Sequence, residues 1–176
     1  GLKLFVDGAR LAYSLASPAN DVSLADIARL SDVFYIGGTK CGTLFGEAVV
    51  IPDGGSIRQF VTQMKQHGAL LAKGRLLGVQ FEALFEDDLY LTLGAPGVAA
   101  TKRIREALIR AGYVVTMDSP TNLTFVALDQ AGHERLSRKV QYGIWETLPD
   151  GRLLARFCTS WGTPEEDIKA FEAALA

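Results

Sequence analysis

The sequence predicts an α/β fold in two parts. Short apolar runs typical of strands alternate with segments of helical periodicity up to Ile51, which is the pattern of α/β proteins. A long helical stretch follows, and a second group of strands and helices occupies the rest of the chain. We therefore expect a first part over residues 1–90, which ends in a connecting helix, and a smaller α/β unit over residues 91–176.

The first part is expected to hold its strands and short helices ahead of the connecting helix. The strands are apolar runs bounded by Gly, Pro, Asp or Asn, which punctuate secondary structure. The run that begins at Asp32 is almost continuously apolar, as in a strand buried on both faces of a parallel sheet. Ser23, followed by Asp26, has the pattern of a capping box at a helix start. In chain order we expect a strand at 2–6, helices at 10–16 and 24–31, and strands at 32–38 and 46–51.

The elements beyond Ile51 are predicted from helical spacing and from residues that stop or start helices. Gly68 and Gly78 interrupt the connecting stretch and mark expected breaks. Thr163 is expected to cap the last helix, with Pro164 in its first position. Helices are expected at 57–84, 98–111, 134–148 and 163–176, and strands at 113–117, 122–129 and 151–161.

Composition and charge argue against several classes of protein. The 176 residues are 48% hydrophobic and 22% charged, with a formal net charge of −2, as in ordinary globular proteins. There is no basic excess to neutralise phosphates, so we expect no nucleic-acid partner. No apolar run approaches the roughly 20 residues of a membrane span, so we expect no membrane partner.

The cysteines point to a reducing compartment. Cys41 and Cys158 lie far apart, without CxxC spacing or a His/Cys cluster. We therefore expect no disulfide framework and no metal site, and we expect a cytoplasmic location.

Lys40 is the first candidate functional residue. It lies in the stretch "GGTKCGT", between two runs of strand formers. A lysine at the end of a buried strand is expected to lose hydration, which lowers its pKa and frees the amine to attack a carbonyl. The neighbouring glycines would let a flat cofactor or its phosphate approach the backbone. The alternative is an ordinary exposed lysine on a glycine-rich turn.

Asp7 is the second candidate, because it follows the first expected strand in "VDGAR". A carboxylate there is placed to pair with a protonated ring nitrogen, and Arg10 is close enough in sequence to face the same cleft. A Schiff-base lysine together with an acid for a pyridinium is the pair that pyridoxal phosphate (PLP) chemistry needs. The alternative role for Asp7 is a helix N-cap.

These segments resemble a known family. "DGARL" followed by "DVFYIGGTKCGTLFGEAVV" resembles the L-threonine aldolase and β-eliminating lyase family of fold-type I PLP-dependent enzymes, and most of all the low-specificity threonine aldolase type. "SPTNLTFVAL" and "RFCTSWGTPEEDI" resemble the small C-terminal domain of the same proteins. The resemblance implies that residues 1–90 are the C-terminal part of the PLP-binding large domain and that residues 91–176 are the small domain. The chain opens on a strand-like run without an initiator Met, so we expect it to be the C-terminal piece of a longer protein.

The resemblance also implies roles for individual residues. Lys40 would form the Schiff base with PLP, and Asp7 would bind the pyridine nitrogen. Arg10 would contact the cofactor or the substrate carboxylate. Arg156 matches the arginine that clamps the α-carboxylate, a task suited to a bidentate guanidinium. Thr39 would donate to a phosphate or satisfy the backbone of its own turn.

A further basic segment is assigned through the same resemblance. "QMKQHGALLAKGRLLGVQF" resembles the segment with which one subunit reaches its neighbour's phosphate, with Lys65 and Arg75 as candidates ahead of Lys73. The family pattern here is richer in glycine, and a solvated basic helix face is the alternative. A site shared in this way implies a homodimer or homotetramer.

The implied reaction is retro-aldol cleavage of a β-hydroxy-α-amino acid to glycine and an aldehyde. β-Elimination or racemisation on the same scaffold is the alternative within PLP enzymes. From other classes, a non-catalytic fragment or interaction module stays open, whereas a Rossmann-like nucleotide-binding half lacks a GxGxxG run. Because the family's proton acceptor and main phosphate loop are expected in the N-terminal half, we expect little or no turnover from this chain alone.

Overall fold

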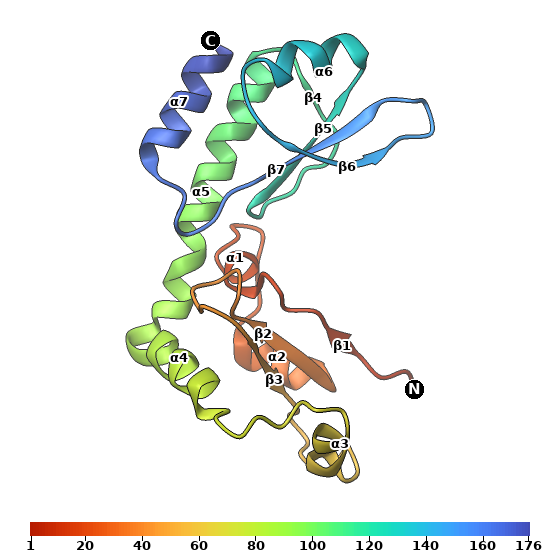
Figure 1. Cartoon of the computed structure of the whole chain (residues 1–176), viewed down its shortest axis with the longest axis vertical. Coiled ribbons are helices and arrows are strands. Elements are labelled where there is room, and N and C mark those ends of the chain that lie inside the picture. The colour runs from red at the N-terminus through yellow and green to blue at the C-terminus, as the bar shows by residue number, and fades with distance from the viewer. The chain divides into compact units, whose positions relative to one another are not determined.

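The computed structural model describes residues 1–176 and contains two compact units (Figure 1). The first unit comprises residues 1–15 and 20–92, and the second comprises residues 16–19 and 93–176. Each unit has its own sheet, and the two sheets differ in topology. The assignment of residues 1–90 and 91–176 to a PLP-binding part and a small C-terminal domain stays a prediction.

The first unit is built on a three-stranded sheet in the order β1-β2-β3. Its elements are β1 (Phe5–Val6), α1 (Leu11–Leu15), α2 (Leu24–Leu30), β2 (Val33–Gly37) and β3 (Glu47–Val50). β1 and β2 are parallel, and α1 and α2 lie in the crossover connection that a parallel pair requires. β3 returns antiparallel to β2. Each element was predicted, although β1 is much shorter than the expected strand at 2–6.

β2 is buried on one face only. Phe34 and Ile36 are buried, whereas Val33 and Tyr35, which point to the opposite face, are half-buried. The expectation of a strand buried on both faces of a parallel sheet is therefore wrong for the second face, because nothing in this chain covers it fully.

The predicted capping box at the start of α2 is confirmed. The Ser23 hydroxyl accepts a hydrogen bond from the Asp26 amide at 3.2 Å, and the Asp26 carboxylate accepts one from the Ser23 amide at 3.0 Å. The Ser23 hydroxyl also donates to the Asp26 carboxylate at 2.7 Å, and this hydrogen bond, followed by those from the Ser23 amide and Arg29, lowers the pKa of Asp26 to about 2. The carboxylate thus serves the helix start in its charged form.

The connecting stretch forms several helices. They are α3 (Phe60–Gln66), α4 (Arg75–Phe85), the short 3₁₀ turn η1 (Glu86–Asp88) and α5 (Leu89–Arg110). Gly68 lies between α3 and α4 with a φ of +70°, so the break predicted there is confirmed. The break predicted at Gly78 is wrong, because Gly78 lies inside α4.

α5 begins well before the expected helix at 98–111 and includes Pro96. Gly94 and Pro96 are residue types that commonly interrupt a helix, yet buried residues recur at helical spacing from Tyr90 through Gly94, Gly97 and Thr101. Packing of this stripe overrides the local signal for a break. None of the helices, α5 included, combines the length and apolar character that crossing a membrane would require.

The second unit contains a four-stranded antiparallel sheet in the order β4-β5-β7-β6. Its elements after α5 are β4 (Val114–Val115), β5 (Leu123–Leu128), α6 (Gln130–Ser137), β6 (Gly143–Thr147), β7 (Leu153–Cys158) and α7 (Glu165–Leu175). The helix expected at 134–148 is wrong beyond Ser137, since β6 occupies the second half of that range. Ile144, Trp145 and Thr147 favour an extended backbone, and pairing with β7 provides it.

The start of α7 also differs in detail from the prediction. Pro164 is the N-cap residue, and it makes no side-chain capping hydrogen bond. Thr163 lies one residue too early for that role. Its hydroxyl instead accepts a hydrogen bond from the Ser160 amide at 2.8 Å, and it therefore stabilises the turn before the helix.

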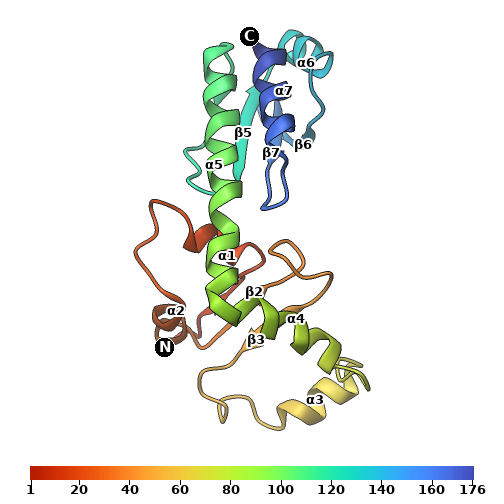
Figure 2. The ribbon, with the colours of Figure 1, turned by 90° about the vertical axis from the view of Figure 1, so that its left-hand side faces the viewer.

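The core of the second unit lies between its sheet and its helices. Figure 2 shows α5 and α7 side by side along the sheet. Arg103 on α5 links the two helices, because its guanidinium donates to Glu165 at 2.7 Å and to Glu172 at 2.7 Å. The buried core side chains are Ile104, Ala107, Leu108, Tyr113, Val126, Leu128, Leu136, Ala155, Phe157, Ile168 and Leu175.

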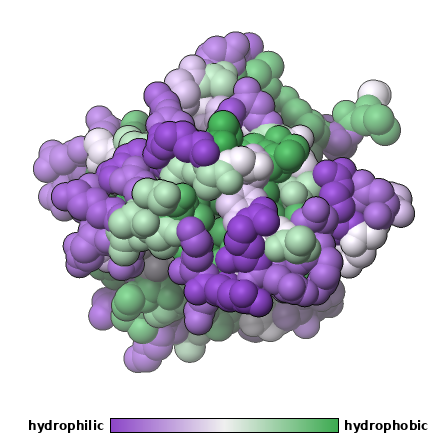
Figure 3. Space-filling view, turned by 90° about the horizontal axis from the view of Figure 1, so that it is seen from above, coloured by the Kyte–Doolittle hydropathy of each residue, from purple (hydrophilic) through white to green (hydrophobic).

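Apolar side chains also reach the surface, and Figure 3 shows such residues among polar ones on one face of the chain. In the first unit, Leu44 is 87% exposed, and Leu76 and Val79 on α4 are 58% and 52% exposed. The connecting helices therefore carry apolar surface that this chain does not bury.

Leu108→Ala should lower the free energy of unfolding of the second unit by about 2–5 kcal/mol, because the change removes a fully buried side chain and leaves a cavity. Ile109→Ala is the matched control, since Ile109 is the next residue but is 52% exposed. Urea unfolding followed by circular dichroism measures both variants. Equal losses in the two would contradict the placement of Leu108 in the core.

Candidate active site

The parallel pairing of β1 and β2 brings Asp7 to Tyr35. Val6 pairs with Phe34, so the next residue of each strand lies beside the other. The Tyr35 hydroxyl donates a hydrogen bond to Oδ1 of Asp7, and the Ala9 amide donates to the same oxygen at 3.0 Å. Both hydrogen bonds use Oδ1, which leaves Oδ2 of Asp7 to accept from another group.

The surroundings of Asp7 stabilise its ionised form. The hydrogen bond from Tyr35, then the one from the Ala9 amide, and then the positive charges of Lys40 and Arg10 lower the pKa of the Asp7 carboxyl. The same contact raises the pKa of the Tyr35 hydroxyl to about 12. Asp7 is therefore a carboxylate at neutral pH, with the two predicted cationic residues close enough to act on it.

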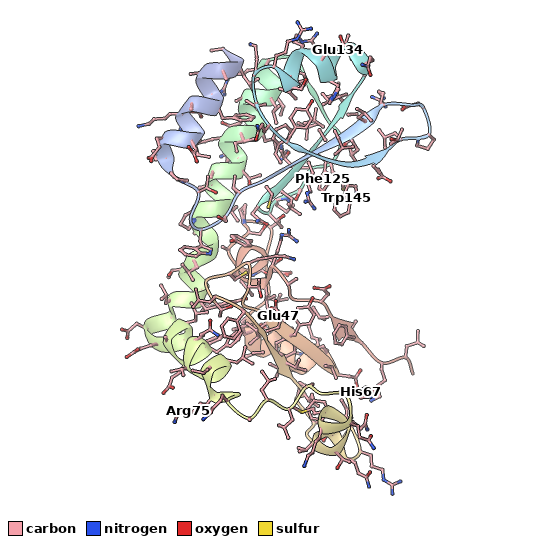
Figure 4. The ribbon with its side chains drawn as sticks, in the orientation of Figure 1. Glu47, His67, Arg75, Phe125, Glu134 and Trp145 are labelled. Carbon is pink, nitrogen blue, oxygen red and sulfur yellow. The ribbon has the colours of Figure 1, made fainter.

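Lys40 lies in the turn of residues 38–43, which we call the lysine turn. The Gly38 carbonyl accepts hydrogen bonds from the amides of Cys41 at 2.8 Å and Thr43 at 3.1 Å. The Gly38 amide donates to Oε2 of Glu47 on β3 at 2.6 Å. The Glu47 carboxylate and the Cys41 and Thr43 amides thus fix the backbone on both sides of Lys40. Figure 4 labels Glu47 in the first unit.

The side chain of Lys40 is exposed. The expected loss of hydration is therefore wrong for this chain, because the lysine turn projects beyond the end of β2 and no other element covers the amine. The backbone of Lys40 is held nevertheless, since its carbonyl accepts a hydrogen bond from the Tyr13 hydroxyl at 2.7 Å. Thr39 is exposed too, and its hydroxyl makes a long 3.5 Å contact with the Gly46 carbonyl.

Cys41 is a buried residue of the lysine turn. It is 0% exposed, and burial is the largest of the effects that raise the pKa of its thiol. A buried neutral thiol packs as a small apolar group.

Two glycines allow the Asp7 and Lys40 segments to approach. The Gly37 amide donates to the Gly8 carbonyl at 2.9 Å. A Cβ on Gly8 would overlap the carbonyl oxygen of Tyr35, and a Cβ on Gly37 would overlap the carbonyl of Gly8. Only residues without a side chain fit this approach.

Arg10 lies close to Asp7, as predicted. Both line a cavity of about 430 Å³ with Ala9 and Ser14, and Lys40 does not reach its wall. Arg10 is half-buried and forms no ion pair within the chain. Its guanidinium is therefore available to an anionic group that enters this cavity.

Arg156 lies in the second unit, on β7, where it borders a cavity of about 460 Å³. Its guanidinium lies 4.9 Å from the centre of the Trp145 ring, and Trp145 packs edge-on against Phe125 with 6.0 Å between the ring centres. Figure 4 labels Phe125 and Trp145 in the second unit. Arg156 has no carboxylate partner in the chain. A stacked arginine without an acid retains its donors for a carboxylate from outside.

The basic residues of the connecting helices are not brought to the Asp7 site. Lys65 on α3 and Arg75 at the start of α4 are exposed, and neither bonds to Asp7, Arg10 or Lys40. Figure 4 places Arg75 well away from Glu47. Their side chains face solvent in this chain.

Several residues of these sites escaped sequence analysis. They are Tyr13, Tyr35, Glu47, Tyr90 and Trp145. The Tyr13 and Tyr90 hydroxyls donate to the Lys40 and Gly37 carbonyls, respectively. Tyr35 bonds to Asp7, Glu47 bonds to the Gly38 amide, and Trp145 stacks with Arg156. No local motif marks them. Strand register alone could have indicated Tyr35, since it pairs opposite Asp7 once β1 and β2 are aligned.

Comparison with known proteins adds independent information. No family model matches the chain. The low specificity L-threonine aldolase of Pseudomonas aeruginosa is 28% identical over 174 residues, which cover 96% of this chain and 48% of that protein. The solved threonine aldolase of Leishmania major is 43% identical with a TM-score of 0.91, and the match covers 99% of this chain and 51% of that one. A structure of SPT with a PLP internal aldimine has a TM-score of 0.55 at 16% identity and covers 99% of this chain and 47% of that one.

These likenesses confirm the predicted fold class: the chain has the fold of the C-terminal part of a fold-type I PLP-dependent enzyme. The predicted resemblance to the threonine aldolase family is also confirmed, and it extends over essentially the whole chain. The chain spans about half the length of the curated relatives that it matches.

Tyr35→Phe should raise the pKa of Asp7 toward its ordinary value of 3.8, because the largest stabilising contact of the carboxylate is lost. A lowered pKa in the folded chain contributes stability that is present above the unfolded value and is lost as the pH falls through the folded pKa. The variant should therefore lose less stability on acidification below pH 4. Carbon NMR of the Asp7 carboxyl during a pH titration measures the shift directly. Tyr142→Phe, which removes a hydroxyl in the second unit, should leave Asp7 unchanged, and an unmoved pKa in Tyr35→Phe would contradict the account.

Proposed function

We propose that this chain is the C-terminal half of a PLP-dependent lyase of the threonine aldolase type. The observation that carries the proposal is the convergence of Asp7, Arg10 and Lys40 at the carboxyl edge of two adjacent parallel strands. Similarity to threonine aldolases over nearly the whole chain supports it.

The residues at this edge fit PLP. A pyridine nitrogen that carries a proton needs an ionised carboxylate with a free oxygen, and Asp7 offers Oδ2 with a lowered pKa. The cofactor aldehyde needs an accessible amine, and Lys40 is exposed on a fixed turn. When bound, PLP supplies an electron sink for cleavage of a bond next to an amino group.

The protein groups would bind and orient in this site. Asp7 would pair with the ring nitrogen, and Lys40 would supply the amine that holds the cofactor at its aldehyde group. Arg10 binds an anionic group in the cavity that it shares with Asp7. Thr39 is a candidate phosphate donor, because its hydroxyl is exposed beside Lys40.

Arg156 is proposed to hold the substrate. Its guanidinium has no acid partner and is stacked on Trp145, which favours a planar, bidentate contact with an α-carboxylate. The substrate class that this arrangement supports is an amino acid with a β-hydroxyl group, cleaved to glycine and an aldehyde. The names of the curated relatives support the same class.

The remaining parts of the site are proposed to lie in the length of the relatives that this chain does not span. A base must accept the β-hydroxyl proton. We do not assign this role to His133, because its ring hydrogen-bonds to the Tyr142 hydroxyl at 2.9 Å in the second unit. We propose a homodimer or homotetramer in which Lys65 and Arg75 reach a neighbour's phosphate; exposure and freedom from ion pairs support these two residues.

Incubation with PLP, reduction with borohydride and peptide mass mapping should place the pyridoxyl label on Lys40. Lys40→Ala should abolish that label, whereas Lys139→Ala, which removes an exposed lysine of the second unit, should leave it in place. Asp7→Asn should reduce the label at Lys40, because the ring nitrogen loses its charged partner. Label spread over exposed lysines, with no excess at Lys40, would contradict the assignment.

A further inference from the structure

The backbone around Lys40 is fixed by side chains from three other elements. The Tyr13 hydroxyl on α1 donates to the Lys40 carbonyl at 2.7 Å, and the Tyr90 hydroxyl on α5 donates to the Gly37 carbonyl at 2.9 Å. Glu47 on β3 accepts from the Gly38 amide at 2.6 Å. The exposed lysine side chain therefore stands on a backbone that is anchored at several points.

Tyr13 is the anchor that acts on Lys40 itself. Its side chain is 1% exposed, and a buried tyrosine hydroxyl requires a hydrogen-bond partner. Here that partner is a main-chain carbonyl in a turn without regular secondary structure. A hydrogen bond of this length and type restricts the one residue of the turn from which the amine projects.

Tyr13 also belongs to the segment that carries the acid. α1 follows directly after Asp7 and Arg10, and its first turn is tied back to them, because the Leu11 amide donates to the Gly8 carbonyl at 2.9 Å. One short stretch of chain thus presents the carboxylate of Asp7 and, six residues later, the hydroxyl that holds Lys40. The spacing between acid and amine depends on this stretch and not only on the strand pairing.

We infer that Tyr13 is a positioning residue that sets the main chain of Lys40 relative to Asp7. The inference rests on the proposed function, since the spacing matters because one ring must meet both residues. Catalytic groups act only within narrow tolerances of position, so a fixed backbone under the lysine raises the fraction of molecules ready to bind. Loss of the hydroxyl leaves the Lys40 carbonyl to water and lets the lysine turn sample other arrangements.

The test compares Tyr13→Phe with Tyr142→Phe. Tyr13→Phe keeps the buried ring and removes only the hydroxyl, whereas Tyr142→Phe removes a hydroxyl that bonds to His133 in the second unit. Two readouts are taken: the PLP concentration that half-saturates borohydride-trapped label at Lys40, and the hydrogen–deuterium exchange rates of the Cys41 and Thr43 amides. Exchange of the Ile27 amide in α2 reports whether the first unit stays folded.

In Tyr13→Phe we expect half-saturation at Lys40 to require roughly two- to tenfold more PLP, the change that loss of one hydrogen bond implies. The Cys41 and Thr43 amides should exchange faster, Ile27 should not change, and Tyr142→Phe should match the parent chain. Unchanged half-saturation and exchange would overturn the inference and leave the proposed function intact. Equal acceleration at Ile27 would overturn it as well, because the role would then be general stability.

The two proposals fail in different ways. If the parent chain takes no selective label at Lys40, the proposed function fails in this chain. Faster exchange confined to the lysine turn would still support the hold of Tyr13 on Lys40, because that readout needs no cofactor.

Discussion

The parallel pairing of β1 and β2 is the constraint on which the candidate site depends. Only Phe5 and Val6 of β1 take part in the ladder, and the Gly8 carbonyl extends it by accepting the Gly37 amide. The approach is so close that neither glycine has room for a Cβ. A short contact between two glycine segments thus places an acid and a lysine, distant in sequence, at one edge of a sheet.

Much of the fold could be predicted because its signals are local. The capping box of α2 and the apolar run of β2 depend on neighbouring residues, and both are confirmed. The prediction of a helix at 134–148 is wrong in its second half, because β6 forms there by pairing with β7. Local periodicity does not reveal that distant partner. The predicted helix start at residue 98 is wrong for a related reason, because packing extends α5 back to Leu89 and through Pro96.

In the candidate site, too, residues marked by local sequence could be predicted, and residues set by distant packing could not. Asp7, Arg10 and Lys40 could be chosen from their residue types and positions at expected strand ends. The hydroxyls of Tyr13 and Tyr35 could not, because their partners are set by strand register and by the packing of α1. The exposure of the Lys40 amine was also missed, since hydration depends on what covers a turn and not on its own apolar neighbours.

α5 belongs to both compact units, since its first residues fall in one and the rest in the other. Near its start, Tyr90 bonds to the strand that leads into the lysine turn, and further along Ile104 and Leu108 fill the core of the second unit. Unfolding of this helix would therefore lower the stability of both regions at once. It would remove the Tyr90 hydrogen bond beside the lysine turn and the Ile104 and Leu108 contacts of the second core together.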